Sequence, residues 1–248
     1  MSLAGRSSPI AQGEVRIWYA RTDDAWRDIE RRARVVACLT PAEAVRHARF
    51  RHDIDRDMFL LGRAMARTLV GRALGVPPWA WAWAEGPHGR PEVSGHASHV
   101  SFNIAHSAGM VVCALSRDAA VGVDIEHRHR PPTDPRIVRR FCSPLEVADI
   151  ERQGLDGWRD QFLRYWTLKE AYLKARGLGI GVPLADVSFT LGDRVRVDFL
   201  DSLAGTDTNW AFALVEPDHG HFVAVATPAS PAAHPAFIVE PFPTTFLP

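Results

Sequence analysis

The tetrapeptide Ser143-Pro144-Leu145-Glu146 repeats the pattern of an earlier tetrapeptide, Thr40-Pro41-Ala42-Glu43. Each one supplies a hydroxyl N-cap, a proline at the first helical position and a glutamate at the third, which together mark the start of a helix. A second apolar helix is expected after each, because apolar runs open at Phe59 and Phe162, nineteen residues beyond the two N-caps. The matched spacing favours a duplicated unit over coincidence, although this helix-start pattern is common in proteins.

Strand-like segments follow these helices, and they cover residues 100–104, 110–115, 121–125, 187–191, 195–200, 210–215 and 222–226. The sequence therefore predicts an α+β fold of two pseudo-symmetric halves, at 15–118 and 119–226. Residues 1–14 are expected to form a loose N-terminal tail, and the proline-rich residues 227–248 an extended C-terminal tail outside the core. An active site shared by the halves is expected in the cleft between them.

The composition limits the classes of partner. The 29 basic and 29 acidic residues of the 248-residue chain balance, so no overall field favours nucleic acid or an anionic membrane. No segment approaches the roughly 20 apolar residues of a membrane span, and the N-terminus lacks the layout of a signal peptide. Three scattered cysteines suit neither a disulfide framework nor a cysteine metal site, so a reduced, cytoplasmic setting is expected. A chain that carries both halves can form their cleft alone, so we expect a monomer.

The two lysines of the chain lie close together. The other 27 Lys and Arg positions are all arginine, whereas Lys169 and Lys174 flank Glu170. An ammonium group is a compact charge that can approach a phosphate and whose pKa can shift, properties that the guanidinium group lacks. The pair therefore indicates a site for phosphate binding or proton transfer, although two residues can also lie together by chance.

Two carboxylates lie on one face of the predicted strand at 121–126. A strand alternates its faces, so the valines and isoleucine of this segment point to a core while Gly122, Asp124 and Glu126 point the other way. Two carboxylates about 7 Å apart along a strand suit a hard divalent cation such as Mg²⁺, and the glycine would leave room for a ligand. The alternative is a half-exposed strand with a polar outer face.

The predicted helix at 160–176 carries a polar stripe. Trp166, Glu170 and Lys174 follow at i, i+4 and i+8, the spacing of one helix face, and Gly177 is a plausible C-cap. Glu170 could serve as a further metal ligand or a general base, with Lys174 facing a phosphate. The alternative is an ordinary surface ion pair worth ~0.3–0.5 kcal/mol.

Three basic side chains could bind an anion. His106 follows a predicted strand in a loop of small residues, Arg90 lies in the turn Gly86-Pro87-His88-Gly89-Arg90-Pro91, and Arg46 belongs to a basic cluster near a helix end. Such residues are more often solvated surface groups than ligands.

Four segments together resemble the Sfp-type 4′-phosphopantetheinyl transferases. They are Gly89-Arg90-Pro91, 102–107 (FNIAHS), 121–126 (VGVDIE) and 162–174, and their order and spacing agree with the family over residues 15 to 226. The resemblance implies a pseudo-dimer of one α+β unit that binds coenzyme A in the cleft. Such an enzyme transfers the 4′-phosphopantetheine arm to a serine of an acyl- or peptidyl-carrier protein, as in polyketide and nonribosomal peptide synthesis, and releases 3′,5′-ADP.

The resemblance also implies roles for the acidic residues and one lysine. Asp124, Glu126 and Glu170 would bind Mg²⁺, with Mn²⁺ as a possible substitute, and the metal would offset the charge that repels an attacking oxygen. Glu170 matches the residue proposed as general base for the carrier serine, although a metal-bound water at Asp124 or Glu126 could relay the proton instead. Lys174 would contact the pyrophosphate and stabilise the departing 3′,5′-ADP.

The remaining matches concern the nucleotide end of coenzyme A. The resemblance implies that His106 and Arg46 hold the 3′-phosphate and that Arg90 lies near the adenine. Ala105 departs from the family, which has serine before the histidine. A hydrogen bond to a charged group contributes roughly 1.5–3 kcal/mol, so coenzyme A binding could be weaker without loss of activity.

Two other classes of function share these residues. A non-catalytic coenzyme A-binding or carrier-docking homologue is the main alternative, and Ala105 is the feature that favours it. A Mg²⁺-dependent nucleotide pyrophosphatase would need the same carboxylates and lysine. For a transferase, the arginine-rich segment 127–141 is a candidate carrier-docking region, and a solvated loop is its alternative.

Overall fold

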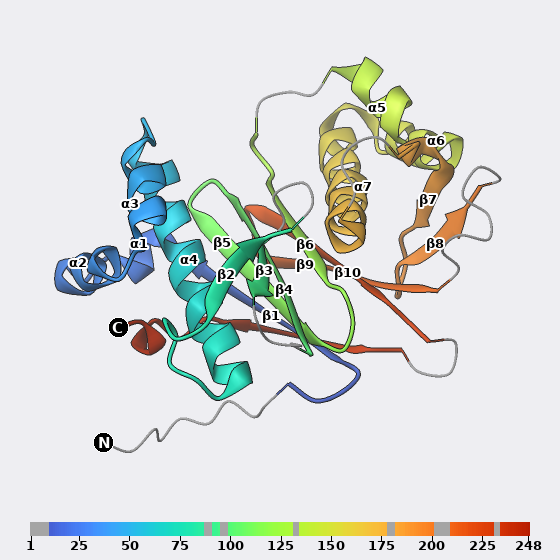
Figure 1. The fold of residues 1–248 in the computed structure, drawn as a ribbon. Helices are drawn as coiled ribbons and strands as arrows, with labels where there is room; N and C mark the ends of the chain where they lie inside the picture. The colour runs from blue at the N-terminus through green and yellow to red at the C-terminus, as the bar shows by residue number, and fades with distance from the viewer. Residues whose placement is uncertain are drawn as a thin grey trace.

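The computed structural model describes residues 10–86, 91–94, 99–130, 134–177, 182–200, 209–230 and 234–248 (Figure 1). The first half is built on a four-stranded sheet in the order β11-β1-β5-β4. Strands β1 (Glu14–Arg21), β5 (Met110–Arg117) and β4 (Val100–Ser107) are antiparallel neighbours, and β11 (Ala236–Pro241) lies parallel to β1. A separate hairpin joins β2 (Ala82–Glu85) to β3 (Pro91–Ser94).

Four helices lie on the outer side of this sheet: α1 (Thr22–Ala25), α2 (Ile29–Ala37), α3 (Pro41–Ala48) and α4 (Asp53–Leu74). The second half has a three-stranded sheet, in the order β6 (Gly122–His127), β10 (His221–Pro228) and β9 (Trp210–Asp218). Its helices are α5 (Pro135–Phe141), α6 (Pro144–Arg152) and α7 (Gly154–Arg176), and a small hairpin pairs β7 (Val187–Thr190) with β8 (Arg196–Phe199). Short 3₁₀ turns cover Leu184–Asp186 and Thr244–Phe246.

Each sheet is covered on both faces. One core cluster lies between α4 and the first sheet, a second lies between α7 and the second sheet, and a third lies between the two sheets. Strand β5 shows the consequence, because Val111 and Cys113 join the first cluster while Val112 and Ala114 join the third. Alternate residues point to opposite faces, so a strand between two apolar layers is apolar along its length.

The helix-start signals and the duplicated layout are confirmed. Thr40 and Ser143 each form a full capping box with the glutamate three residues on. In both halves that glutamate also pairs with a cation of the long helix that follows, Glu43 with Arg67 at 2.9 Å and Glu146 with Lys169 at 2.8 Å. The long helices begin before the apolar runs that predicted them, at Asp53 and Gly154. All the predicted strands form, within three residues of the expected bounds.

The C-terminal segment is not a tail outside the core, so that expectation is wrong. Residues 236–241 form β11 and extend the first sheet, and Phe242 and Leu247 are buried in its core. Composition predicted the absence of helix, but pairing with an edge strand depends on the tertiary fold, and an edge tolerates prolines. At the other end, Ile10 is buried and β1 begins at Glu14, so 10–14 is also attached to the fold. No helix in the described ranges is long and apolar enough to cross a membrane.

Candidate active site

Helix α7 packs directly on β6 because Gly122 lacks a side chain. A Cβ atom at Gly122 would overlap the backbone of α7 at Ala171 and Ala175. The glycine therefore makes room for a helix, whereas the sequence suggested room for a ligand. Close packing brings the polar stripe of α7 against the outer face of β6, while Val123 and Ile125 enter the core between the sheets, as predicted.

Each member of the stripe faces a carboxylate of β6. Lys174 Nζ donates a hydrogen bond to Asp124 Oδ1 at 2.6 Å, and the Trp166 side chain donates to Glu126. Glu170 lies between these two residues on the helix, and the charge of Asp124 acts on it. The predicted i, i+4, i+8 stripe is thus one wall of a polar site.

Two carboxylates of the site, Glu126 and Glu170, have raised pKa values. Burial, followed by the charge of Asp124, raises the pKa of Glu126 to about 7, although Arg130 pairs with it. The same two causes raise the pKa of Glu170, with Lys174 and Arg130 opposing them. Three carboxylates against two cations leave one excess negative charge when all five ionise. Such a site favours a further cation or a proton.

One atom of the site fits a metal ion. Asp124 is 8% exposed, and its Oδ2 atom is buried without a hydrogen-bond partner among the described residues. A buried carboxylate oxygen normally has a partner, and oxygen donors are what Mg²⁺ prefers. In the described ranges, however, no three His, Cys, Asp or Glu side chains are gathered closely enough to hold a metal. Lys174 and Arg130 engage Asp124 and Glu126 instead.

His106 brings the first half to this site. It is the next-to-last residue of β4. Its side chain is exposed, but nearby protein atoms partly desolvate it, and this desolvation, followed by the Lys174 charge, lowers its pKa. Arg46 of α3 contributes to the same lowering, and its guanidinium also lies 5.5 Å from the Phe59 ring centroid. Lys174 and Arg46, which come from opposite halves, therefore both act on His106 against the opposing charge of Asp55. An anionic ligand would stabilise this group of basic side chains.

Models of two families match the two halves separately. The N-terminal model of 4′-phosphopantetheinyl transferase covers residues 24–118, and the 4′-phosphopantetheinyl transferase superfamily model covers 120–226. A phosphopantetheinyl transferase from Thraustochytrium is 36% identical over 208 residues, which are 79% of this chain and 72% of the relative. The chain belongs to the 4′-phosphopantetheinyl transferase family. The family and the enzyme class predicted from the four segments are thus confirmed.

The chain is also similar to two bacterial relatives and to one solved structure. A 4′-phosphopantetheinyl transferase of Bacillus subtilis is 31% identical over 64% of this chain and 70% of its own length. The 4′-phosphopantetheinyl transferase Sfp of Bacillus subtilis strain 168 is 28% identical over 84% of this chain and 88% of its own. Among solved structures, a holo-[acyl-carrier-protein] synthase from Neisseria meningitidis matches 45% of this chain and 98% of its own, with 14% identity and a TM-score of 0.39.

The two lysines of this phosphopantetheinyl transferase have different surroundings. Lys169 is fully buried, pairs with Glu146 and donates to the carbonyl oxygens of Leu184 and Val187. It joins α7 to the start of α6 and to β7, away from the polar stripe. The clustering of lysines thus pointed to the correct helix, but only Lys174 faces the site.

Ala105 does not face the site. It is 6% exposed and belongs to the apolar cluster between the sheets, because it alternates with His106 along β4. A serine side chain there would lie among apolar groups. The residue that favoured a non-catalytic transferase homologue therefore gives that alternative no support.

One predicted site residue lies outside the described part of the chain, and two observed contacts were not predicted from the sequence. Arg90 lies outside the described residues, so its position near the adenine remains a prediction. Arg130 and Trp166 contact Glu126 but were not assigned to it. The spacing of Glu126 and Arg130 could not reveal the pair, because they lie on either side of the end of β6 rather than on one helix.

Proposed function

We propose that this chain transfers the 4′-phosphopantetheine arm of coenzyme A to a serine of an acyl- or peptidyl-carrier protein and releases 3′,5′-ADP. The main support is the ion pair between Lys174 of α7 and Asp124 of β6. His106, from the other half, is close enough to Lys174 for the lysine charge to lower its pKa. Membership of the family supports the reaction class. A monomer in the cytoplasm is a further prediction, consistent with three free cysteines.

Asp124, Glu126 and Glu170 would hold Mg²⁺, or Mn²⁺, through carboxylate oxygens. The unpartnered Asp124 Oδ2 and the excess negative charge support this assignment. When bound, the ion would neutralise charge on the pyrophosphate. To bind the metal, Glu126 would have to break its ion pair with Arg130.

The residues of the chain have separable tasks in the reaction. The carrier serine oxygen forms a bond to the phosphorus that bears the pantetheine arm, and the bond from that phosphorus to the bridging oxygen breaks. Glu170 would take the serine proton, and its raised pKa would make it a stronger base than an ordinary carboxylate. Lys174 would balance the charge that develops on the departing 5′-phosphate. His106 and Arg46 would hold the 3′-phosphate.

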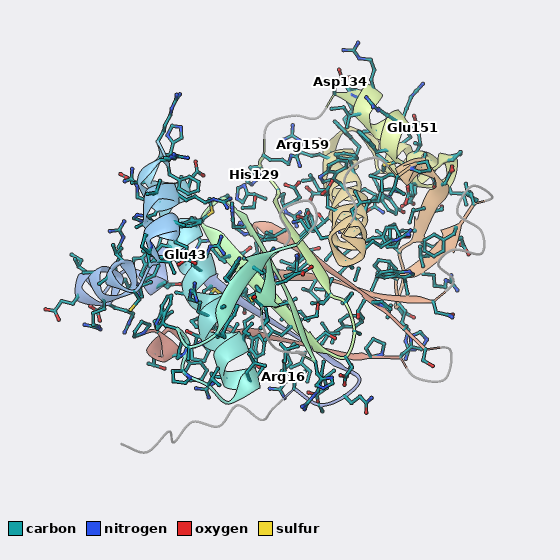
Figure 2. The ribbon with its side chains drawn as sticks, viewed as in Figure 1. Arg16, Glu43, His129, Asp134, Glu151 and Arg159 are labelled. Carbon is teal, nitrogen blue, oxygen red and sulfur yellow. The ribbon has the colours of Figure 1, made fainter. Side chains whose placement is uncertain are left out.

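The carrier would dock on the outer end of the second half. In the segment 127–141, Arg139 is largely exposed, and it borders a hollow of about 310 Å³. The apolar lining comes from α5, α6 and the start of α7, and includes Val138, Ile150, Leu155 and Trp158. Asp134 and Glu151 lie at this end in Figure 2. An apolar hollow bordered by Arg139 suits a helix that has both apolar and acidic side chains, with an acidic group that would compete with Glu151 for this arginine.

The decisive experiment is mass spectrometry of an intact apo carrier after incubation with the protein, coenzyme A and Mg²⁺. The proposal requires a gain of one phosphopantetheine arm that EDTA abolishes. Glu170→Gln and Asp124→Asn should remove the gain while the protein stays folded. Near-normal turnover in either variant would show that the metal-site assignment is wrong. Release of 3′,5′-ADP without a carrier would instead indicate a pyrophosphatase.

A further inference from the structure

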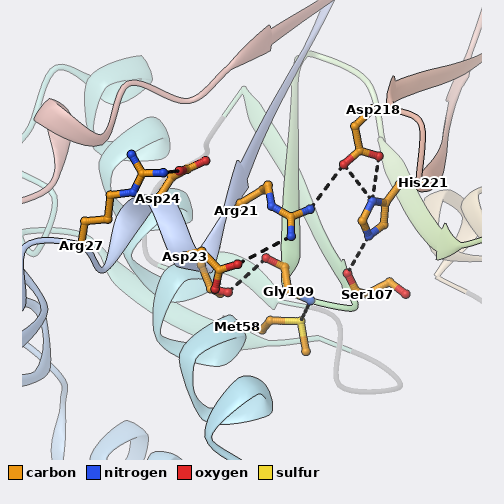
Figure 3. Close-up of polar contacts among 10 residues, drawn as sticks. Arg21, Asp23, Asp24, Arg27, Met58, Ser107, Gly109, Asp218 and His221 are labelled. Carbon is orange, nitrogen blue, oxygen red and sulfur yellow. Dashed lines mark hydrogen bonds and ion pairs between the residues drawn. The ribbon is translucent and has the colours of Figure 1, made fainter.

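The turn that follows His106 is held in an unusual backbone conformation. Ala108 and Gly109 have φ values of 45° and 84°, so both lie in the left-handed region. This conformation suits a two-residue hairpin turn but is unfavourable for alanine. The first half anchors the turn at Gly109, whose carbonyl accepts from the Thr22 backbone at 2.8 Å and whose N–H points at Met58 Sδ at 3.2 Å. Figure 3 shows the contact between Met58 and Gly109.

The second half holds the same turn through His221. The Nε2 atom of this ring lies 3.2 Å from the carbonyl oxygen of Ser107, the residue next to His106. A carbonyl can only accept, so Nε2 is the donor. The residue is 1% exposed, although it lies at the start of β10 in a polar cluster. Because the His221 ring is buried and hydrogen-bonded to the other half, it has a structural role that a solvated surface histidine lacks.

Further groups fix the His221 ring from its other side. Asp218 Oδ1 lies 2.9 Å from His221 Nδ1, and the same atom accepts from the Gly220 backbone at 2.8 Å. Burial opposes ionisation of Asp218, but the bonds from His221 and Gly220 outweigh it and lower its pKa. Arg21, at the end of β1, contacts Asp218 at 3.4 Å, and the His127 ring lies 4.8 Å from His221 between centroids.

These contacts connect the halves twice beside the site. Arg21 of the first half meets Asp218 of the second, and His221 of the second meets Ser107 of the first (Figure 3). His106 moves with Ser107, whereas Lys174 belongs to the second half. The His221–Ser107 bond is therefore placed to fix where His106 lies relative to Lys174.

We propose that His221 is a positioning residue for substrate binding: through Ser107 it holds His106 where both halves can contact the phosphates of coenzyme A. This inference rests on the proposed function, since it takes the anionic substrate to be coenzyme A. His221 does not itself touch the substrate. Its loss should therefore weaken binding of the phosphate that His106 contacts and leave the chemical step largely intact.

A pair of amide substitutions separates the two bonds of the ring. In His221→Gln, the side-chain amide can reach the position of Nε2 and still donate to Ser107. In His221→Asn, the amide reaches only the position of Nδ1, so the Ser107 bond is lost. We expect the asparagine variant to raise the KM for coenzyme A about five- to tenfold, the effect of one hydrogen bond, with kcat and the carrier KM near wild type. The glutamine variant should restore most of the affinity.

His99 offers a control in a solvent-exposed histidine–aspartate pair. It forms a similar pair with Asp118, at 2.9 Å between Nδ1 and Oδ1, at the opposite end of the β4–β5 hairpin. His99→Ala should leave the coenzyme A KM unchanged. In addition, 3′-dephospho-coenzyme A should bind wild type and His221→Asn with the same affinity in calorimetry, because it lacks the phosphate assigned to His106.

Several results would overturn the inference. It is wrong if the asparagine and glutamine variants have the same coenzyme A affinity. It is also wrong if the variants change the KM of both substrates and kcat to the same extent and lower the melting temperature, because that result would indicate a general structural role. A wild-type protein that binds coenzyme A but transfers nothing would contradict the proposed function alone. Calorimetry of the two variants would then still decide the role of His221.

Discussion

Lys174 Nζ lies 2.6 Å from Asp124 Oδ1, so the cation proposed to contact the substrate is held by a carboxylate proposed to bind metal. The pair joins α7 to β6 across the site. When an anionic substrate and a metal ion bind together, each partner of the pair gains a new counter-charge. The ion pair thus keeps two charged groups in place without a ligand and can separate when both ligands arrive.

Removing Lys174 should affect the reaction more than the fold. Lys174→Met deletes the charge near the departing phosphate, and loss of one such stabilising group typically lowers kcat by about 10²–10³-fold. Lys174→Arg retains the charge but not the compact ammonium group, so its kcat should lie between those of wild type and Lys174→Met. Steady-state transfer assays with saturating carrier test this order. Equal rates for wild type and Lys174→Met would remove Lys174 from the mechanism.

Lys169 should behave in the opposite way. Lys169→Met leaves Glu146 buried without its cation, and breaking a buried pair in this way costs about 3–5 kcal/mol. Urea unfolding should show this loss, whereas Lys174→Met, at a part-exposed site, should change the free energy of unfolding by much less. If Lys169→Met is as stable as wild type, the Lys169–Glu146 ion pair between α7 and α6 does not stabilise the fold.

In the metal-free protein, Glu126 should contribute less to stability as the pH rises toward neutrality. Glu126 has a folded pKa of about 7 against an unfolded value of 4.5, so the folded state binds its proton more tightly. The contribution of Glu126 to the free energy of unfolding should therefore fall between pH 4.5 and 7, by about 3 kcal/mol, and stay low above that range. Urea unfolding in EDTA measures the slope. Glu126→Gln, which does not titrate, should reduce it.

Added Mg²⁺ should reverse this trend. A metal that binds the ionised carboxylates competes with their protons, so it stabilises the protein more at pH 8 than at pH 6. The shift in melting temperature on adding Mg²⁺ should increase between these two values. A shift that does not depend on pH, or that persists in Asp124→Asn, would place the metal elsewhere.

Gly122 should be intolerant of even one methyl group. In Gly122→Ala the new Cβ overlaps the α7 backbone, so the helix must move away from β6 and carry Glu170 and Lys174 with it. We expect lower stability and lower transfer activity together. Gly192→Ala is the control, because beyond the adjoining residues the nearest atom there, the Arg194 carbonyl oxygen, is 3.9 Å from an added Cβ. Normal activity in Gly122→Ala would contradict the close packing described here.

Charge reversal should reveal the carrier-docking surface. Arg139→Glu combined with Arg140→Glu is expected to raise the carrier KM several-fold and to leave coenzyme A affinity unchanged. Arg27→Glu, an equally exposed reversal in the first half, should leave both unchanged. Since exposed charges are screened, the effect should shrink at high salt. An unaffected carrier KM would exclude this surface.

Local signals in the sequence determined much of this protein. Proline-containing capping boxes marked two helices, alternation placed Asp124 and Glu126 on one face of a strand, and helical spacing put Glu170 and Lys174 on one stripe. These features depend on a few consecutive residues or on one element, and backbone periodicity fixes them wherever the element lies. The family resemblance followed from the same short segments.

Only the tertiary structure decided which of these groups meet. The sequence treated Lys169 and Lys174 alike, but packing buries the first against Glu146 and turns the second toward Asp124. It gave no sign that β11 pairs with β1, or that His221 reaches Ser107, because the partners lie far apart along the chain. Such contacts depend on how two sheets and their helices exclude water together, a property of the assembled halves rather than of any segment.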